Sequence, residues 1–467
     1  MPLELRTRAF PFRLETAAVD AAKRYSAVSY WQETVPVQPR DPLVGDTVSD
    51  LLIVGGGFTG LSVACAVKRA APQLDVVLIE RAVIGHGASG RNGGFAMPLI
   101  GWDLTDVVRK VGQAKAAETY LLMYDAVDHL RNEIKRHGID CDMEETGYLL
   151  LATCKARLER VRHEADLGQR LGFPLSFLER EGVSEHIASD AFLGGVFDPK
   201  PFVVNPFKLA RGLLRLAEQL GVRVYEQTPV RSLDNGDTIT ATVEGGRVRA
   251  RQLVLALNGY GASMGFMERR IHPVHTYIVM TEPLANDDLE RIGWARRRTS
   301  LETARHFIHY FRLTKDNRVL FGGEDAQLFY GGGLRDHHAP SYVRLEARFR
   351  EYFPGLNHIQ FTHRWGGVLG VTLDMIPTIG VSGPNGNVYH AAGYSGHGVA
   401  LSNYAGRLLA PHIIRRAGLE VEESSPPAPA PIFWNRRPAA LPPDPLRYLG
   451  LQAYRAALRL HDRIQGA

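Results

Sequence analysis

The stretch at residues 51–60 constrains the fold of this chain more than any other. An apolar run leads into Gly-x-Gly-x-x-Gly, made by Gly55, Gly57 and Gly60. A helical pattern follows, and a second apolar run ends on Glu80. Short apolar runs of this kind are typical of buried parallel strands. The pattern therefore predicts a strand–helix–strand unit that binds a dinucleotide.

Each part of this unit has a physical role. Gly55 allows a tight turn, Gly57 leaves space for a pyrophosphate, and Gly60 lets the helix pack closely on the strand. The N-terminus of the helix offers N–H donors and the positive end of its dipole to phosphates. Glu80 can accept hydrogen bonds from ribose hydroxyls. The motif alone leaves NAD and FAD open, and a tight turn without a ligand is the structural alternative.

Length and composition set the class of protein. The chain has 467 residues, which is enough for two or three domains, with 45% hydrophobic and 22% charged residues. A net charge of +5 is a mild basic bias that fits small anions better than a nucleic-acid surface. Three scattered cysteines favour a reducing compartment. Because we find neither a secretory signal nor an apolar run long enough to span a membrane, we expect a cytoplasmic protein without a membrane span.

The remaining chain alternates between strand and helix patterns without an internal repeat. Nucleotide-type elements recur near residue 50, at 222–260 and at 386–410, with inserts between them. A domain built from discontinuous segments and interleaved with a second domain accounts for this order. We expect helices at 104–138, 155–172, 205–221 and 445–464, and strands within 147–153, 222–257, 272–281 and 306–323.

Five separated motifs, in this order, carry a resemblance to a known family. They are the glycine fingerprint with Glu80, Gly-Ala-Ser-Gly-Arg-Asn-Gly-Gly at 87–94, Asn-Pro-Phe-Lys-Leu at 205–209, Ile-His-Pro-Val-His-Thr-Tyr at 271–277, and Gly-Tyr-Ser-Gly-His-Gly at 393–398. With them, residues from about 30 to 415 resemble the D-amino-acid-oxidase-like superfamily of FAD-dependent oxidoreductases. Within it, the chain is most similar to the gamma-glutamylputrescine oxidoreductase group.

The resemblance implies a mixed α/β fold in two domains. The first is a discontinuous, Rossmann-like FAD-binding domain with a parallel sheet, at 49–103, 200–262 and 361–415. The second is a substrate domain, at 104–199 and 263–360, with helices and a mixed, largely antiparallel sheet that covers the flavin. An irregular N-terminal arm, 1–48, and a proline-rich tail with a final helix, 416–467, complete the chain.

The resemblance and the glycine motifs together predict the FAD site. Glycine loops, a hydroxyl and a guanidinium suit the pyrophosphate and the polar edge of the flavin, and a helix start can stabilise charge on the reduced ring. No cysteine or histidine matches a covalent tether, so we expect non-covalent FAD and no metal. The predicted cofactor residues are Gly55, Gly57, Phe58, Thr59, Gly60, Glu80, Arg81, Ser89, Gly90, Arg91, Asn92, Gly93, Gly94, Val230, Gly259, Gly393, Gly396, His397 and Gly398.

The family's reaction is the oxidation of an amine. Hydride passes from the carbon that bears nitrogen to flavin N5, and the imine is hydrolysed to an aldehyde or ketone plus ammonia or amine. Oxygen is the expected acceptor and would give hydrogen peroxide; a dehydrogenase that uses a quinone or carrier is the alternative. An RNA-associated flavoprotein and a scaffold without turnover are less favoured. The sequence does not determine the oligomeric state.

Candidate residues for the substrate side come from strand and turn motifs. We predict catalytic roles for His275, Tyr277 and His397, with His275 near the flavin as a cation for oxygen reduction. The alternatives are packed sheet residues and, for His397, a helix cap. The predicted substrate-binding residues are Tyr310, Arg312, Tyr394 and Trp365.

One position departs from the family pattern. Amino-acid and glycine oxidases of the superfamily often carry an arginine, in Gly-Leu-Arg-Pro, that holds the substrate carboxylate. Here Leu369 occupies that position. The sequence therefore favours an amine without an adjacent carboxylate, or one held by another arginine such as Arg312 or Arg91.

Overall fold

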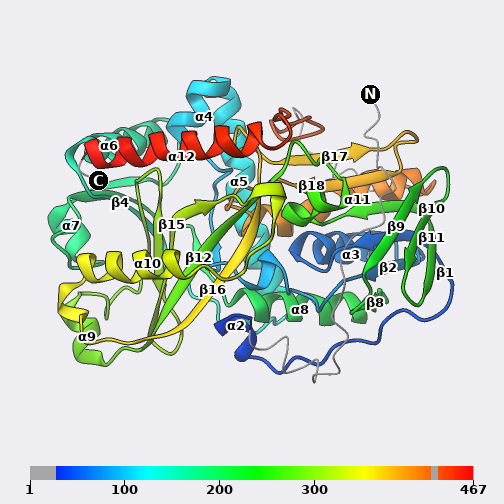
Figure 1. Cartoon of the computed structure of the whole chain (residues 1–467), viewed down its shortest axis with the longest axis horizontal. Coiled ribbons are helices and arrows are strands. Elements are labelled where there is room, and N and C mark those ends of the chain that lie inside the picture. The colour runs from blue at the N-terminus through cyan, green and yellow to red at the C-terminus, as the bar shows by residue number, and fades with distance from the viewer. Residues whose placement is uncertain (1–27, 422–429, 466–467) are drawn as a thin grey trace.

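The computed structural model describes residues 28–421 and 430–465, so predictions for the rest of the arm and tail fall outside the described residues. Two sheets stand beside each other, each with its own helices (Figure 1). The predicted fold class, a mixed α/β fold with one mainly parallel and one mainly antiparallel sheet, is confirmed.

The first sheet is assembled from three separate parts of the chain, at 47–79, 223–255 and 378–392. Strands β18, β11, β1, β2 and β8 are parallel, and β17, β10 and β9 add antiparallel pairs. In sheet order, with the β10–β9 hairpin last, the strands are β17 (Thr378–Ser382), β18 (Val388–Ala392), β11 (Gly246–Leu255), β1 (Thr47–Val54), β2 (Val76–Ile79), β8 (Arg223–Tyr225), β10 (Ile239–Val243) and β9 (Val230–Asn235).

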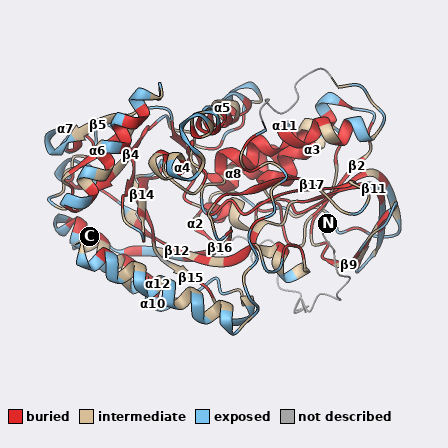
Figure 2. Cartoon of the chain, turned by 90° about the horizontal axis from the view of Figure 1, so that it is seen from above, coloured by how far each residue is buried: buried red, intermediate tan, exposed pale blue. Residues whose placement is uncertain are grey.

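Both faces of this sheet are covered, which explains its unbroken apolar strands. Leu51 and Ile53 of β1 pack with the helices of one face, and Leu52 and Val54 pack with the β9–β10 hairpin on the other. The helices of the first face are largely buried (Figure 2). They are α3 (Phe58–Ala70), α5 (Gln113–Arg136), α8 (Pro206–Gln219) and α11 (Val399–Arg416).

The second sheet is antiparallel except for the β13–β4 pair. Its outer face packs against α10 (Ala339–Tyr352) in an aromatic core. In order, its strands are β16 (Phe361–Val371), β12 (His272–Pro283), β15 (Arg318–Gln327), β14 (His309–Leu313), β13 (Ser300–Thr303), β4 (Tyr148–Ala152), β6 (Gly194–Asp198) and β5 (Ser176–Glu179).

Some boundaries differ from the sequence prediction. Strand β16 is the edge of the second sheet, although residues from 361 were predicted to belong to the FAD-binding domain. The helix predicted over 104–138 is divided at Gly112, whose φ of 81° interrupts the helical backbone.

The remaining elements connect the strands and helices described above. They are α4 (Leu104–Val111), α6 (Lys155–Arg170), α7 (Arg180–Ser184), α9 (Asn286–Arg291), β3 (Phe95–Ala96), β7 (Phe202–Val203), and the 3-10 turns η1 (Ala88–Gly90), η2 (Asn258–Met264), η3 (Tyr330–Gly332) and η4 (Pro354–Leu356).

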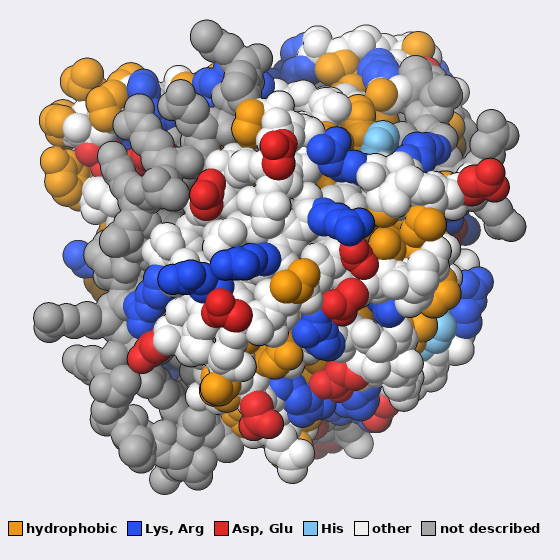
Figure 3. All heavy atoms as spheres, turned by 90° about the vertical axis from the view of Figure 1, so that its right-hand side faces the viewer, with side chains coloured by type: hydrophobic (Ala, Val, Ile, Leu, Met, Phe, Trp, Pro, Cys, Tyr) orange, Lys and Arg blue, Asp and Glu red, His pale blue; other side chains and the backbone are white. Residues whose placement is uncertain are grey.

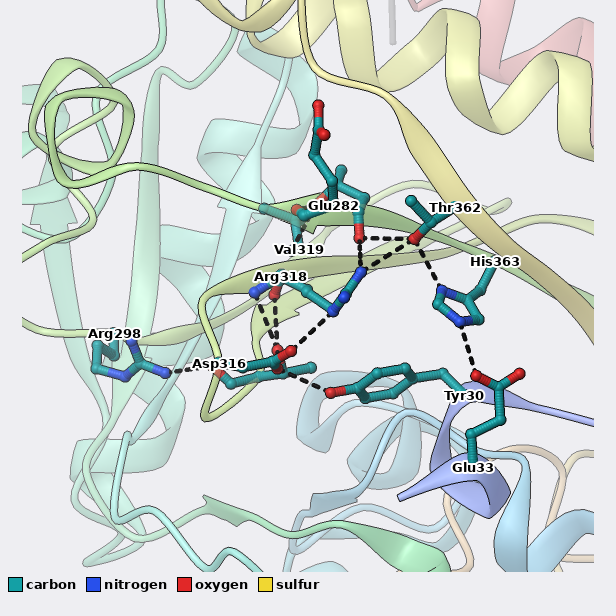
Figure 4. A network of polar contacts seen from close by, with 11 residues as sticks. Tyr30, Glu33, Glu282, Arg298, Asp316, Arg318, Val319, Thr362 and His363 are labelled. Atoms are coloured by element: carbon teal, nitrogen blue, oxygen red, sulfur yellow. Dashed lines mark hydrogen bonds and ion pairs between the residues drawn. The ribbon is translucent and has the colours of Figure 1, made fainter. Parts of the chain in front are cut away.

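The described part of the N-terminal arm is fastened to the second sheet through α2 (Tyr30–Glu33). The Tyr30 hydroxyl donates to Asp316 at 2.8 Å, and Glu33 lies 3.0 Å from His363 of β16 (Figure 4). Arg318 joins Asp316 to the hydroxyl of Thr362, 3.1 Å from its guanidinium. The arm therefore lies over the junction of the two sheets.

Charges on the molecular surface are mixed. On the face shown in Figure 3, Lys and Arg side chains are interspersed with Asp and Glu side chains. Such mixing gives no single-sign field over that face. None of the described helices has the length and apolar character needed to cross a membrane.

Candidate functional site

The glycine fingerprint forms the floor of a cleft at the carboxyl end of β1. Gly55 has φ of 111°, and a Cβ there would lie 2.5 Å from the carbonyl oxygen of Ala256. A Cβ on Gly60 would lie 2.1 Å from the carbonyl oxygen of Gly55. Both glycines are therefore required by the backbone itself. Gly60 serves packing and does not line the cleft.

Gly57 and Ser89 face each other across the mouth of this turn. The Ser89 hydroxyl accepts a hydrogen bond from the Phe58 N–H at 2.9 Å. A Cβ on Gly57 would lie 2.8 Å from that same oxygen. The first turn of α3 thus meets the loop at 87–94 at a point that has no space for a side chain.

Glu80 closes the far end of the βαβ unit at the tip of β2. Its carboxylate accepts hydrogen bonds from the N–H groups of Gly56, at 2.8 Å, and Ala82, at 2.9 Å. Burial raises the pKa of Glu80, while the two N–H donors oppose that rise by stabilising the charged form. Glu80 lines the cleft beside Thr228 and Val230. It therefore lies where a ribose would follow an adenine.

The turn at 393–398 supplies the third wall. The Tyr394 and Thr59 hydroxyls lie 2.8 Å apart, so this turn is bonded to the first turn of α3. Asn258, at the end of β11, accepts from the Gly393 N–H at 3.0 Å. The turn opens α11, and the N-terminus of that helix presents its positive dipole end to the cleft.

The cleft between these walls has an empty volume of about 1430 Å³, its open mouth included. Most predicted cofactor residues of the first motif reach it, as do parts of the other motifs. The predicted residues that line it are Gly55, Gly57, Phe58, Thr59, Glu80, Arg81, Ser89, Asn92, Val230, Tyr394, Gly396 and Gly398.

Other predicted cofactor residues lie behind the cleft wall. Gly90, Gly93, Gly94, Gly259 and Gly393 are in contact with neighbouring loops, where added Cβ atoms would clash. The Arg91 guanidinium lies 2.7 Å from Asp336, and its Nε donates to the carbonyl of His86 at 2.7 Å. The structure therefore gives Arg91 a role in joining the loop to the second sheet.

His397 lies at the same wall without lining the cleft. Its Nδ1 is buried and has no hydrogen-bond partner among the described residues. Burial lowers the pKa of His397 to about 4, so its imidazole is neutral at physiological pH. A neutral ring with an unused polar atom marks a place where a ligand atom would complete a hydrogen bond.

Sequence reasoning missed several residues of the cleft. Asn258, Tyr260 and Met264 enter it from η2, and the Arg81 guanidinium lies 5.2 Å from the centre of the Tyr260 ring. Val368 enters from β16, beside Leu369, whose position the sequence had already singled out. The position of η2 just after β11 was the available signal, since ligands of such sheets lie beyond the carboxyl ends of the strands.

The residues present fit a dinucleotide. One cleft contains the features that such a ligand needs. They are the open approach at Gly57, which has no side chain, the N-termini of α3 and α11, and the carboxylate of Glu80. The family model for FAD dependent oxidoreductases, DAO, matches residues 50–411. The chain belongs to this family. FAD is its cofactor, and its own residues at 55–59, 80, 89, 396 and 398 would hold it.

Curated relatives of this FAD-dependent oxidoreductase cover most of the chain. Gamma-glutamylputrescine oxidoreductase of Escherichia coli (strain K12) is 32% identical over 377 residues, which cover 80% of this chain and 85% of that protein. A probable oxidoreductase, OrdL, of Rhizobium meliloti (strain 1021) is 32% identical over 390 residues, with 82% and 87% covered. The predicted family resemblance is confirmed.

Solved structures share the fold. Glycine oxidase from Geobacillus kaustophilus superposes with a TM-score of 0.66 at 22% identity, covering 81% of this chain and 99% of that one. L-Proline dehydrogenase from P. horikoshii also gives 0.66, at 19% identity, with 80% and 95% covered. The arrangement of the two sheets in this oxidoreductase is therefore that of known flavoenzymes.

The structure does not bring His275 and Tyr277 to the cleft. Strand alternation turns Ile278 and Trp365 toward the FAD-binding layer, and turns Tyr277 into the aromatic core under α10. His275 is fully buried against Phe329 and accepts from the Arg335 N–H at 3.0 Å. Burial lowers its pKa to about 4. The predicted cation beside the flavin is thus corrected to a neutral, packed histidine.

The predicted substrate residues separate into two groups. Trp365 donates to the Arg91 carbonyl at 2.8 Å, and the Tyr310 ring packs against Phe95, so both lie behind the 91–94 loop. Tyr394 lines the cleft. Arg312 instead donates to the Val204 carbonyl at 2.8 Å and lines a different cavity, together with Asp142 and Glu144. Arg312, predicted to bind substrate, therefore does not line the FAD cleft.

We expect substitutions at His275 and Tyr277 to affect folding and to leave electron transfer unchanged. Tyr277→Phe removes the hydrogen bond from the hydroxyl to the Arg335 carbonyl, 3.0 Å long, at a cost of about 1 kcal/mol in unfolding free energy. His275→Gln should retain the rates of flavin reduction and reoxidation. Thermal unfolding and stopped-flow measurements of both half-reactions check this. Slowed reoxidation in His275→Gln would restore the oxygen role.

We also expect FAD to be released intact by acid or heat. The three cysteines, Cys65, Cys141 and Cys154, are buried and none lines the cleft. Burial raises the pKa of Cys65 to about 12, which keeps its thiol protonated and unreactive. Precipitation followed by absorption spectra of pellet and supernatant measures the release. Yellow colour that stays with the washed, unfolded pellet would contradict non-covalent binding.

Proposed function

We propose that this enzyme oxidises the C–N bond of an amine that carries no carboxylate on the reacting carbon. FAD would supply the acceptor for the hydride that leaves that carbon, and water would hydrolyse the resulting imine to a carbonyl compound and ammonia or an amine. The chain's own residues then have three tasks: to hold the amine, to keep it uncharged, and to exclude a carboxylate.

The observation that carries the proposal is the apolar end of the cleft. Val368 and Leu369 form this end together with Tyr394, and Leu369 lies beside Gly396. Among the described residues that line the cleft, the only arginines are Arg81 and Arg231, which directly follow Glu80 and Val230 in the chain. A substrate carboxylate at the Leu369 end would therefore be buried without a cation, which is unfavourable.

Arginines close to this end in the sequence or the fold are engaged elsewhere. Arg91 is paired with Asp336, and Arg312 is buried beneath Trp31 with its guanidinium 5.0 Å from the ring centre. Arg364 of β16 pairs with Glu346 of α10, at 2.6 Å, on the outer side of the sheet. None of the three lines the FAD cleft.

The same apolar surroundings favour a reactive, neutral amine. Desolvation disfavours an ammonium ion, and a neutral His397 adds no charge that would alter this balance. The Tyr394 hydroxyl, held by Thr59, offers an acceptor for an amine N–H at this wall. The name of the relative from Escherichia coli, gamma-glutamylputrescine oxidoreductase, supports an amine as substrate.

We propose oxygen as the electron acceptor, with hydrogen peroxide as its product. The test is an anaerobic titration of the yellow enzyme with a panel of monoamines and diamines, followed by mixing with air-saturated buffer and a peroxide assay. Flavin bleaching by an amine and stoichiometric peroxide are the expected results. Bleaching without reoxidation by oxygen, but with reoxidation by a quinone, would identify a dehydrogenase.

A further inference from the structure

The last helix, α12 (Leu446–Ile464), lies outside the part of the chain that matches the family. It is amphipathic, but its apolar side faces solvent and its polar side faces the protein. It lies along the outer edge of the molecule (Figure 2). The side that faces solvent has no charged residue along its centre. That central stripe consists of Leu446, Leu449, Gly450, Ala453, Ala457, Leu460 and Ile464.

The inward side of α12 carries the polar groups that fix its orientation. Asp462 and Arg157 of α6 form a buried ion pair at 2.9 Å. The Gln452 side chain donates to the carbonyl of Leu328 at 3.2 Å. Just before the helix, Asp444 accepts from the Gly331 N–H at 2.8 Å. Rotation of the helix to bury its apolar side would break these contacts and leave Arg157 unpaired.

The exposure is concentrated on this helix. Among the residues that the structure describes, five of the eleven exposed large hydrophobic side chains belong to α12, with Leu446 65% and Ile464 76% exposed. Single exposed apolar residues are normal on a monomer, but a continuous stripe marks a surface that is covered by a partner.

We propose that this stripe pairs with the α12 stripe of a second copy of the chain, antiparallel, about a two-fold axis at Ala453. In that register Leu446 lies opposite Leu460 of the second copy, and Leu449 lies opposite Ala457. A two-fold interface must be complementary to itself. Here small residues occupy the middle, where the helices would approach closely, and leucines occupy both ends.

Charge supports the same occupant. The chain has a net charge of +5, so two copies meet with less repulsion on a stripe without charged side chains than on a face that carries arginines. An antiparallel pair places the N-terminal dipole end of each helix beside the C-terminal end of the other. A lipid surface fits less well, because the stripe has glycine and alanine at its centre, where a helix that lies in a membrane interface carries large apolar side chains.

The test measures the mass of the FAD-loaded full chain by size-exclusion chromatography with light scattering over a range of concentrations. The wild type should have twice the mass of one chain. Ala453→Glu would place two carboxylates together on the axis and should weaken the dimer at least a hundredfold. Leu121→Glu, on the exposed surface of α5, is the matched control and should remain dimeric. FAD content should be unchanged in both variants.

A cross-link tests the register. Ala453→Cys should form a disulfide between two copies on mild oxidation, because its two positions face each other, whereas Leu121→Cys should not. A monomeric wild type, or a dimer that is equally stable in Ala453→Glu, would overturn the proposal. So would a monomer that sediments with phosphatidylglycerol vesicles and loses this binding in Ala453→Glu, since that result identifies a lipid surface.

Discussion

Gly57→Val should purify without FAD and fail to bind it when the cofactor is added back, with affinity reduced at least a hundredfold. The cause is steric. A Cβ alone would lie 2.8 Å from the Ser89 hydroxyl, which holds the first N–H of α3, and the two methyl groups would fill the approach to the pyrophosphate. Gly57 has φ of −86°, a conformation open to any residue, so the backbone is not strained. The measurements are the flavin absorbance of the purified protein and titration of the apoprotein with FAD.

Gly236→Val is the control for this experiment. Gly236 lies in the exposed turn between β9 and β10, and a Cβ there would have no neighbour closer than 3.9 Å. This variant should bind FAD as the wild type does. Circular dichroism of both apoproteins distinguishes lost binding from lost folding. A folded Gly57→Val protein with the wild-type FAD content would show that the glycine serves only the turn.

The enzyme should react with primary or secondary amines at least a hundredfold more efficiently than with glycine or D-alanine. Leu369 lies at the cleft end where a carboxylate would need a cation. An unpaired, buried carboxylate costs at least about 3 kcal/mol, which corresponds to roughly a hundredfold in affinity. The measurement is the rate of anaerobic flavin reduction as a function of substrate concentration. If D-alanine or glycine reduces the flavin faster than every amine in the panel, the inference fails.

Leu369→Arg tests the same point in reverse. A guanidinium at this wall would pair with a carboxylate in a bidentate manner. The ratio of the efficiency with amines to the efficiency with glycine or D-alanine should therefore fall at least tenfold. Leu369→Met keeps a similar volume without charge and should retain the wild-type preference. An arginine variant that retains FAD and the wild-type substrate ratio would show that the carboxylate-binding position lies elsewhere.

The sequence was sufficient to predict the nucleotide unit, because its signals are local. Apolar strands, the glycine spacing and the terminal Glu80 all lie within thirty residues, and the structure shows the β1–α3–β2 unit that they predict. Prediction of FAD and of the oxidoreductase class is confirmed by the family match. The substrate, the acceptor and the roles of single residues stay predictions.

Long-range pairing decided what local pattern could not. The alternation of β12 shows that two residues share a face, but only its pairing with β16 and packing under α10 show which face His275 and Tyr277 occupy. Arg91 and Arg312 likewise have partners from distant segments, Asp336 and Val204, which remove them from the FAD cleft.

By itself, then, the sequence determined the element types and the glycine turns, since these depend on neighbouring residues. It also determined that position 369 has no arginine, which is a matter of residue identity alone. Tertiary structure alone decided the strand faces, the joining of the 87–94, 258–259 and 393–398 segments into one cleft, and the outward direction of the apolar side of α12. The physical reason is that the contacts responsible join residues far apart in the chain. Burial of the Asp462–Arg157 pair, for example, links positions 305 residues apart.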